Sequence, residues 1–137
     1  MANLFTFEAH TPYRFFFKDQ VMVLVLTLTD GEIGIYAQHT PFIAPVSTGI
    51  LRIKDLHGQW KTAFTTEGIL EVTHHKAILL ADAAEWPEEI DYDRAVLAKE
   101  RATERIASKH FRFEADTAQA TLKRAEFRIK VYGMRGQ

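Results

Sequence analysis

Residues 21 to 35 read Val-Met-Val-Leu-Val-Leu-Thr-Leu-Thr-Asp-Gly-Glu-Ile-Gly-Ile. β-Branched and leucine side chains fill the first part, which is typical of a strand. Asp30-Gly31 follows, and this dipeptide between two strand-like runs is a strong hairpin signal. Ile33 and Ile35 then continue the second run. The stretch predicts an antiparallel hairpin and favours a β-rich fold around it.

Turn signals recur on both sides of this hairpin and divide the first part of the chain into short apolar runs. Thr11-Pro12, His39-Thr40-Pro41, residues 55–58 and His74-His75 separate these runs. Short strands at such spacing indicate a β-sandwich or barrel. We therefore predict an all-β sandwich, or flattened antiparallel barrel, of roughly eight to ten strands over residues 1–86.

The composition divides the chain near Trp86-Pro87. Over its 137 residues the formal net charge is −1. Residues 1–86 hold six basic and nine acidic groups, whereas residues 87–137 hold eleven basic and nine acidic groups and are rich in alanine. Alanine favours helix, and aromatic and β-branched residues favour strands. We expect two domains, at residues 1–86 and 87–137.

Several classes of protein are excluded by the whole sequence. The chain has no cysteine, which excludes disulfides, a thiolate nucleophile and a cysteine-ligated zinc site. The longest apolar run covers residues 21–26, far short of the roughly 20 residues that cross a bilayer, so we expect no direct membrane insertion. A charge close to zero also argues against a nucleic-acid partner. We expect a soluble, cytoplasmic protein.

Two helices are predicted in the second part. Asp91 is a suitable N-cap for the first helix, whose apolar residues recur at helical spacing. Residues 108–115 lose this spacing and are predicted to form the turn. Asp116 and Gln119 resemble a capping box at the start of the second helix, and Gly133 follows its last apolar residue. The apolar positions are Ala95, Ala98, Ala102 and Ile106, then Ala118, Leu122, Ala125, Ile129 and Tyr132.

Four arginines form pairs on these predicted helices. Arg94 and Arg101 lie seven residues apart, and Arg124 and Arg128 lie four apart, so each pair shares one helix face. Like charges at such spacing are unfavourable in an isolated helix. An external anion between the helices, with phosphate favoured because it accepts forked hydrogen bonds, would explain them. An exposed charged face with ion pairs between the helices explains them as well, and the spacing alone favours this second explanation.

The sequence shows no pattern that specifies a metal site or a catalytic centre. His74 and His75 lie beside Glu71, but adjacent strand residues point to opposite faces. No zinc-binding histidine motif, nucleophile elbow or phosphate-binding glycine loop is present. We predict no metal ligand and no catalytic residue.

Five short motifs occur along the chain, at residues 30–35, 39–41, 68–72, 81–82 and 90–95. Their order and spacing resemble the epsilon subunit of the rotary F-type ATP synthase over essentially the full chain. This resemblance implies a non-catalytic central-stalk subunit at the cytoplasmic face of the bacterial membrane, bound peripherally. The implied sandwich contacts the gamma subunit and the c-subunit ring, with the c-ring contacts at Glu32 and His39.

The resemblance also implies that the helical hairpin responds to ATP. In that family a hairpin folded on the sandwich binds ATP, and an extended hairpin enters the alpha/beta ring and blocks ATP hydrolysis. ATP would be a regulatory ligand that is not hydrolysed, and the motif does not specify a role for Mg²⁺. A free-standing ATP- or anion-binding module outside the synthase is the alternative function. The implied ATP contacts are Glu85, Asp91, Arg94, Arg101, Arg124 and Arg128.

One residue departs from the family pattern. The family usually has two glycines before the Ile-Leu-Glu-Val stretch, and Glu67 stands here at the first of those positions. A glycine there would permit a positive φ angle. The turn at residue 67 is therefore expected to have different local geometry.

Overall fold

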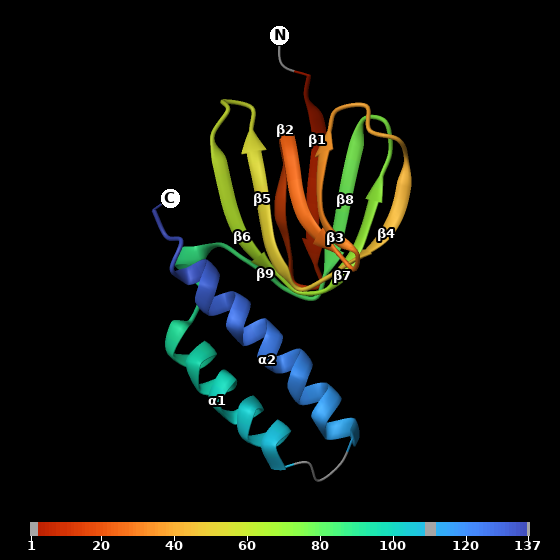
Figure 1. Cartoon of the computed structure of the whole chain (residues 1–137). Helices are drawn as coiled ribbons and strands as arrows, with labels where there is room; N and C mark the ends of the chain where they lie inside the picture. The colour runs from red at the N-terminus through yellow and green to blue at the C-terminus, as the bar shows by residue number, and fades with distance from the viewer. Residues whose placement is uncertain (1–2, 109–111, 137) are drawn as a thin grey trace.

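A computed structural model describes residues 3–108 and 112–136, which form a β-sandwich and a helical hairpin beneath one end of it (Figure 1). The predicted fold class is confirmed. The strands are β1 (Phe5–Thr11), β2 (Arg14–Leu28), β3 (Gly31–Tyr36), β4 (Phe42–Val46), β5 (Gly49–Asp55), β6 (Trp60–Thr65), β7 (Gly68–Val72), β8 (Lys76–Ala81) and β9 (Ala84–Glu85). The helices are the short 3₁₀-helix η1 (Pro87–Glu89), α1 (Tyr92–Ser108) and α2 (Arg112–Tyr132).

The long strand β2 closes the sandwich. Its first part pairs with β1, and its second part pairs with β3 and β5. The strand order is β1-β8-β7-β4-β2-β5-β6-β9, with β3 on β2 and an additional pairing of β1 with β2. Because one strand takes part in both layers, the sheet turns back on itself as a flattened barrel.

Two details of the sheet differ from the sequence prediction. β1 and β8 pair in parallel, which is possible because most of the sandwich lies between them in the chain and no short connection is needed. In the β2–β3 hairpin Leu28 pairs with Gly31, so the turn residues are Thr29 and Asp30. Gly31 begins β3 with a φ angle of 134°, a conformation that glycine adopts without steric cost.

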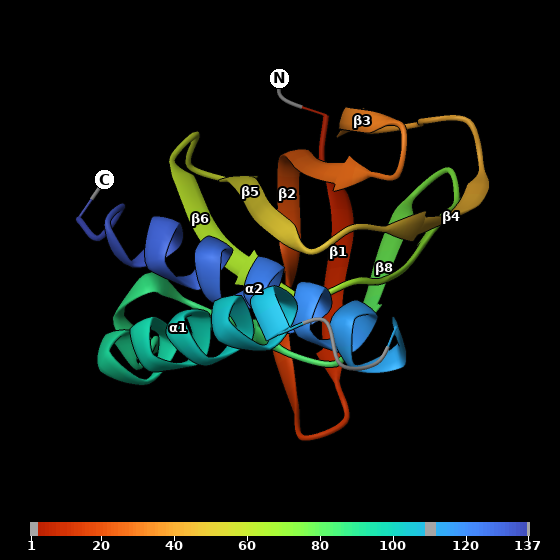
Figure 2. The same ribbon diagram turned by 60° about the horizontal axis from the view of Figure 1, so that its bottom comes forward.

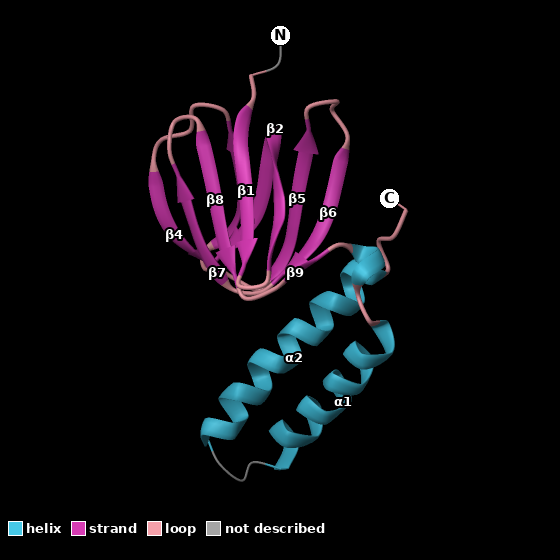
Figure 3. Ribbon diagram, turned by 180° about the vertical axis from the view of Figure 1, so that it is seen from behind, coloured by secondary structure: helices cyan, strands magenta, loops and turns pink. Residues whose placement is uncertain are grey.

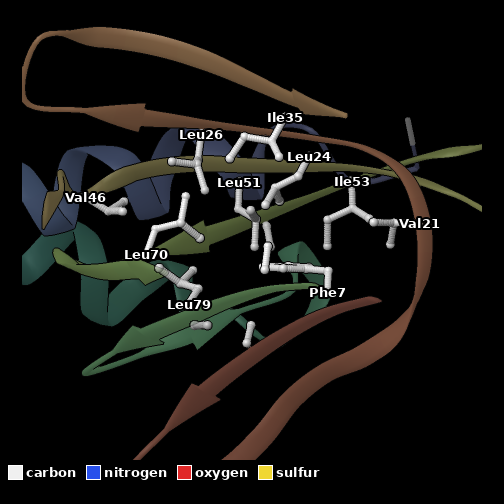
Figure 4. Packing of buried hydrophobic residues seen from close by; sticks show 14 of the residues in the cluster. Phe7, Val21, Leu24, Leu26, Ile35, Val46, Leu51, Ile53, Leu70 and Leu79 are labelled. Carbon is white, nitrogen blue, oxygen red and sulfur yellow. The ribbon is translucent and has the colours of Figure 1, made fainter. Parts of the chain in front are cut away.

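The hydrophobic core lies between the two layers of the sandwich (Figure 4). Phe7, Leu24, Leu51 and Leu70 are all fully buried there. They come from β1, β2, β5 and β7, so the core connects strands from both layers. Alternating inward side chains on β1 and β5 account for these contacts, as the strand period of two requires.

The two helices contact each other through small side chains. Ala95 and Ala102 of α1, and Ala118 and Ala125 of α2, are all buried. Alanines at these positions let the helix backbones approach closely, and α2 lies between α1 and the sandwich (Figures 2 and 3). The alanine positions of the sequence prediction therefore form the contact between the helices.

The start of the second helix is a correction. α2 begins at Arg112 and not at Asp116, which lies within the helix. Residues 112–115 contain arginine, glutamate and alanine, which favour helix, and no glycine or proline interrupts them. Residues 109–111 of the predicted turn lie outside the described residues. At the other end, the Gly133 N–H donates to the Ile129 carbonyl as the helix ends.

The hairpin contacts the sandwich through a second, small hydrophobic cluster. Phe64 of β6, Ile90 and Val131 of α2 are buried together. Partly buried Ile50 and Phe127 surround them. Ile90 follows η1 directly, so the linker and the end of α2 share one contact region on the sandwich.

Among the described residues, no helix is both long and apolar enough to span a membrane.

Candidate functional site

A cavity of about 490 Å³ lies between α1, α2 and the segment that joins the sandwich to the hairpin. This volume is within the range of small-molecule sites. Small side chains of both helices and charged side chains from all three segments line it. The lining residues are Glu85, Glu89, Asp91, Arg94, Ala95, Ala98, Thr121, Arg124, Ala125 and Arg128.

The start of α1 contributes a capped helix end to the cavity. The Asp91 carboxylate accepts a hydrogen bond from the Arg94 N–H at 3.1 Å, as a helix N-cap does. This confirms the cap that the sequence predicts. Arg94 is exposed, and in the described part of the chain its guanidinium has no ion-pair or hydrogen-bond partner. It is a free cation at the edge of the cavity.

The arginines of α2 are paired with acidic residues of the sandwich. Arg128 Nε donates to Glu85 Oε1 at 2.8 Å, and its guanidinium carbon lies 4.6 Å from the centroid of the Phe64 ring. Arg124 donates through one terminal nitrogen to Glu67, and more distantly, at 3.5 Å, to Asp82. These contacts join α2 to strands and turns of the sandwich.

The Nε atom of Arg124 lacks a partner. It is buried and has no hydrogen-bond acceptor within the described residues. A buried donor without an acceptor is costly, by about 1–3 kcal/mol. Arg124 also lines the cavity.

The linker is fixed by a residue that the sequence interpretation does not include. Glu89 of η1 accepts two hydrogen bonds from Arg14, at 2.7 and 2.8 Å, and one from the Trp86 N–H at 2.9 Å. The hydrogen bonds from Arg14 lower the pKa of the Glu89 carboxyl. Glu89 lines the cavity, but its negative charge is neutralised by Arg14. Its hydrogen bonds to Arg14 and to the Trp86 N–H fix the position of the linker.

The structure brings five of the six residues of the expected ATP set to one cavity. Arg101 is the exception: it is exposed on α1 and does not line the cavity. It lies seven residues after Arg94, or about 10 Å along the helix axis. Its position therefore extends the cationic face of α1 beyond the cavity. The five residues that do line it are Glu85, Asp91, Arg94, Arg124 and Arg128.

Sequence reasoning misses three residues that contribute to this region. Thr121 lies three residues before Arg124, so its place on the same face could have been found from helix periodicity. Glu89 and Glu67 could not have been found this way, because their partners are distant in the sequence. Arg14 is 75 residues from Glu89, and Arg124 is 57 residues from Glu67.

The two residues expected at the c-ring do not form one cluster. Glu32 is exposed near the start of β3, and His39 lies in the loop after the end of that strand. The β3–β4 loop is at the end of the sandwich away from the helices (Figure 1). There the His39 ring packs edge-on against Phe42, with 5.3 Å between centroids.

The histidines and acidic residues of the described chain do not gather into a group of three or more that could hold a metal ion. His74 and His75 lie in the turn between β7 and β8, with 6.2 Å between their ring centroids. The arrangement at the cavity is thus one of arginines and carboxylates, which suits a ligand with both anionic groups and hydrogen-bond donors.

Two family models match the chain. One, described as the beta-sandwich domain of the ATP synthase delta/epsilon chain, matches residues 4–87. The other, described as its long alpha-helix domain, matches residues 88–133. Together these matches cover nearly all the described elements.

Curated relatives and solved structures agree with these models. An ATP synthase epsilon chain of Caldicellulosiruptor bescii is 49% identical over 93% of this chain and 92% of its own length. One of Caldanaerobacter subterraneus is 45% identical over 96% and 95%. A chain of the Euglena gracilis mitochondrial ATP synthase has the same fold, with a TM-score of 0.79 at 18% identity over 90% of this chain and 78% of that one. A chain of the Tetrahymena thermophila central stalk and c-ring gives 0.62 at 11% identity over 93% and 96%.

The fold is a β-sandwich joined to a helical hairpin, which is the two-domain arrangement that the two family models describe. The chain belongs to the delta/epsilon family of ATP synthase subunits, and its curated bacterial relatives are epsilon chains. It is a non-catalytic subunit of that complex.

Proposed function

We propose that this epsilon chain is a rotor subunit that joins gamma to the c-ring and senses ATP through its helical hairpin. The observation that carries the ATP part is the buried Arg124 Nε, which lacks an acceptor among the described residues and belongs to a cavity-lining side chain. A phosphate oxygen in the cavity would supply that acceptor. Arginine is well suited to this because its planar donors match phosphate geometry.

The chemistry of the cavity suits a nucleotide better than a simple anion. Arg94, Arg124 and Arg128 offer donors to phosphate oxygens, and Arg101 extends the cationic face. Asp91 and Glu85 offer acceptors, which a phosphate alone would not use but the amino and hydroxyl groups of adenosine would. We assign ATP as a ligand that is bound and not hydrolysed.

ATP in this cavity would stabilise the docked hairpin. The cavity is formed by α1, α2 and the linker together, so it exists only when these segments lie against one another. A ligand that binds only this state stabilises it by RT ln(1 + [L]/Kd). At low ATP the hairpin would leave the sandwich, reach the alpha/beta ring and inhibit hydrolysis.

The contact between hairpin and sandwich is small enough for such a change. Its buried hydrophobic part consists of Phe64, Ile90 and Val131. Partly buried apolar side chains surround this cluster. The ion pairs at Arg124 and Arg128 involve partly exposed side chains, and such pairs contribute little in water. A ligand of ordinary affinity can therefore shift the equilibrium.

The outer face of β4, β7 and β8 is the proposed surface for gamma. Ile43 is 72% exposed, and Ile69 and Leu80 are each 52% exposed. Ile69 and Leu80 are directly paired across β7 and β8, and neighbouring exposed apolar side chains mark interaction surfaces. Glu32 and His39 remain the proposed c-ring contacts, at the cytoplasmic face of the membrane.

Calorimetric titration of ATP into the full chain tests the proposed site. We expect the wild type to bind, and Arg94→Ala to weaken binding by about 1–3 kcal/mol, the value of a charged hydrogen bond. Arg105→Ala is the matched control, because Arg105 is also exposed on α1 but does not line the cavity. No binding at millimolar ATP would reject the sensor, and failure to co-purify with gamma would favour a free-standing module.

A further inference from the structure

Glu67 lies in the turn between β6 and β7 and faces α2 of the hairpin. Its Oε1 accepts a hydrogen bond from Arg124, and Asp82 lies on the same terminal nitrogen at 3.5 Å. Both contacts use the same terminal nitrogen of the guanidinium. The buried Nε has no acceptor among the described residues. Arg124 therefore lies between an internal anion and the cavity.

Two hydrogen bonds with Thr48 fix the position of Glu67. Thr48, which is 2% exposed, donates its hydroxyl to Glu67 Oε2 at 2.5 Å. The Glu67 N–H donates in turn to the Thr48 hydroxyl oxygen at 3.0 Å. Burial alone would raise the pKa of the Glu67 carboxyl, but the hydrogen bonds from Thr48 and Arg124 outweigh burial and lower that pKa. The carboxylate is an ionised, pre-positioned acceptor.

We propose that Glu67 is an internal anion that competes with the nucleotide phosphates for Arg124, and that without nucleotide it stabilises the docked hairpin, but more weakly than ATP does. This inference rests on the proposed function for the identity of the competing ligand. In the structure Glu67 and Asp82 both lie at one terminal nitrogen of Arg124. Phosphate binding turns this guanidinium from the carboxylates toward the cavity.

Competition fixes the sign of the effect on affinity. The Glu67–Arg124 contact stabilises the docked state without nucleotide but is absent from the nucleotide-bound state. Removing the carboxylate therefore destabilises only the reference state, and ATP binds more tightly. If Glu67 instead positioned Arg124 for the phosphates, its contact would be present in both states, and its removal would leave ATP binding unchanged or weaken it.

Glu67→Gln is the variant that tests this inference, because glutamine keeps the length of the side chain and the hydrogen bond from Thr48 but loses the charge. Glu71→Gln is the matched control, since Glu71 is an exposed glutamate on the adjoining strand β7 with no partner in the described part of the chain. Two quantities are measured on the full chain: ATP affinity by calorimetry, and hydrogen exchange of α2 without nucleotide.

For Glu67→Gln we expect ATP affinity to rise about two- to five-fold, the range of a partly exposed ion pair. We also expect faster exchange in α2 without nucleotide, whereas Glu71→Gln changes neither quantity. If the wild type binds ATP and Glu67→Gln binds it equally well or more weakly, the proposed competition is wrong but the ATP site is not. If no variant binds ATP, the proposed function and the competition both fail. Unchanged exchange in α2 would overturn the docking role of Glu67.

Discussion

Arg124 connects the two parts of the molecule at the scale of a single residue. It contacts Glu67 and Asp82 on the sandwich side and lines the cavity between the helices on the other. Arg128, one turn further along the same helix, likewise pairs with an acidic residue of the sandwich, Glu85, and lines the cavity. Two arginines on one helix face therefore contact carboxylates of the sandwich and also line the cavity.

The sequence shows the arginine spacing but not this pairing. Arg124 and Arg128 could be placed on one face because helix periodicity is local. Their carboxylate partners come from turns and strands far along the chain, and no local pattern specifies such contacts. Glu67 does not have the positive φ angle that a glycine there would permit: among the described residues other than glycine, only Gln38 has one.

Gly68 is the glycine of this turn that the fold requires. A Cβ atom at Gly68 would lie 2.0 Å from the Leu80 carbonyl oxygen on the paired strand β8. Because that atom is backbone, Gly68→Ala must displace β7 from β8, and we expect a loss of about 1–3 kcal/mol in the free energy of unfolding. Urea denaturation measures this loss. Gly34→Ala is the control, with its nearest contact at 3.6 Å, and equal stability of the two variants would contradict the account.

Glu8 gives the sandwich a dependence on pH. It is buried on β1, where it accepts a hydrogen bond from Lys76 at 2.5 Å and contacts His10 at 3.0 Å. The hydrogen bond from Lys76 outweighs burial and lowers the pKa of the Glu8 carboxyl. A carboxyl whose pKa is lower in the folded state stabilises that state above its unfolded-state pKa, and this stabilisation is lost as the pH falls through the folded-state pKa.

We therefore expect Glu8→Gln to be less stable than the wild type at neutral pH, with a difference that narrows as the pH falls below the carboxylate range. Thermal unfolding from neutral pH to about pH 3 measures this difference. Glu71→Gln, an exposed glutamate change on β7, should show no such narrowing. A constant gap between wild type and Glu8→Gln at every pH would contradict the role of the Glu8 charge.

At the scale of elements, the hairpin is predictable where its sequence is periodic. The Asp91 cap and the alanine contacts between helices follow from spacing alone. The start of α2 does not, because residues with high helix propensity extend it before the periodic part begins. The parallel pairing of β1 with β8 is likewise set by closure of the sandwich and not by any local turn.

Substitution of Val131 tests whether the hairpin can leave the sandwich while the sandwich core stays folded. It is fully buried against Phe64 and Ile90. Val131→Ala removes two carbon atoms from this cluster, and we expect docking to weaken by about 2 kcal/mol while the sandwich stays folded. Hydrogen exchange should therefore quicken in α2 and remain slow in β2 and β5.

Leu97→Ala is the control for this variant, because Leu97 is 44% exposed on α1 and should not affect docking. If β2 and β5 lost their protection from exchange together with α2 in Val131→Ala, the hairpin and the sandwich would unfold as one unit. That outcome would contradict a hairpin that moves by itself.

At the scale of the whole molecule, the two domains differ in how they are held together. The sandwich has a closed core and exposes Ile43, Ile69 and Leu80. The hairpin rests on three buried side chains and a set of ion pairs around a cavity. A net charge of −1 for the whole chain conceals this division, because the basic excess lies in the hairpin and the acidic excess in the sandwich.

Hydrogen exchange of α1 and α2, measured on the full chain with and without ATP, tests the central claim most directly. The account predicts that ATP slows exchange in both helices and leaves the strands of the sandwich unchanged, and that Arg94→Ala requires more ATP for the same protection. Arg105→Ala should behave as the wild type. Identical exchange of the helices with and without millimolar ATP would contradict a hairpin whose docking depends on the nucleotide.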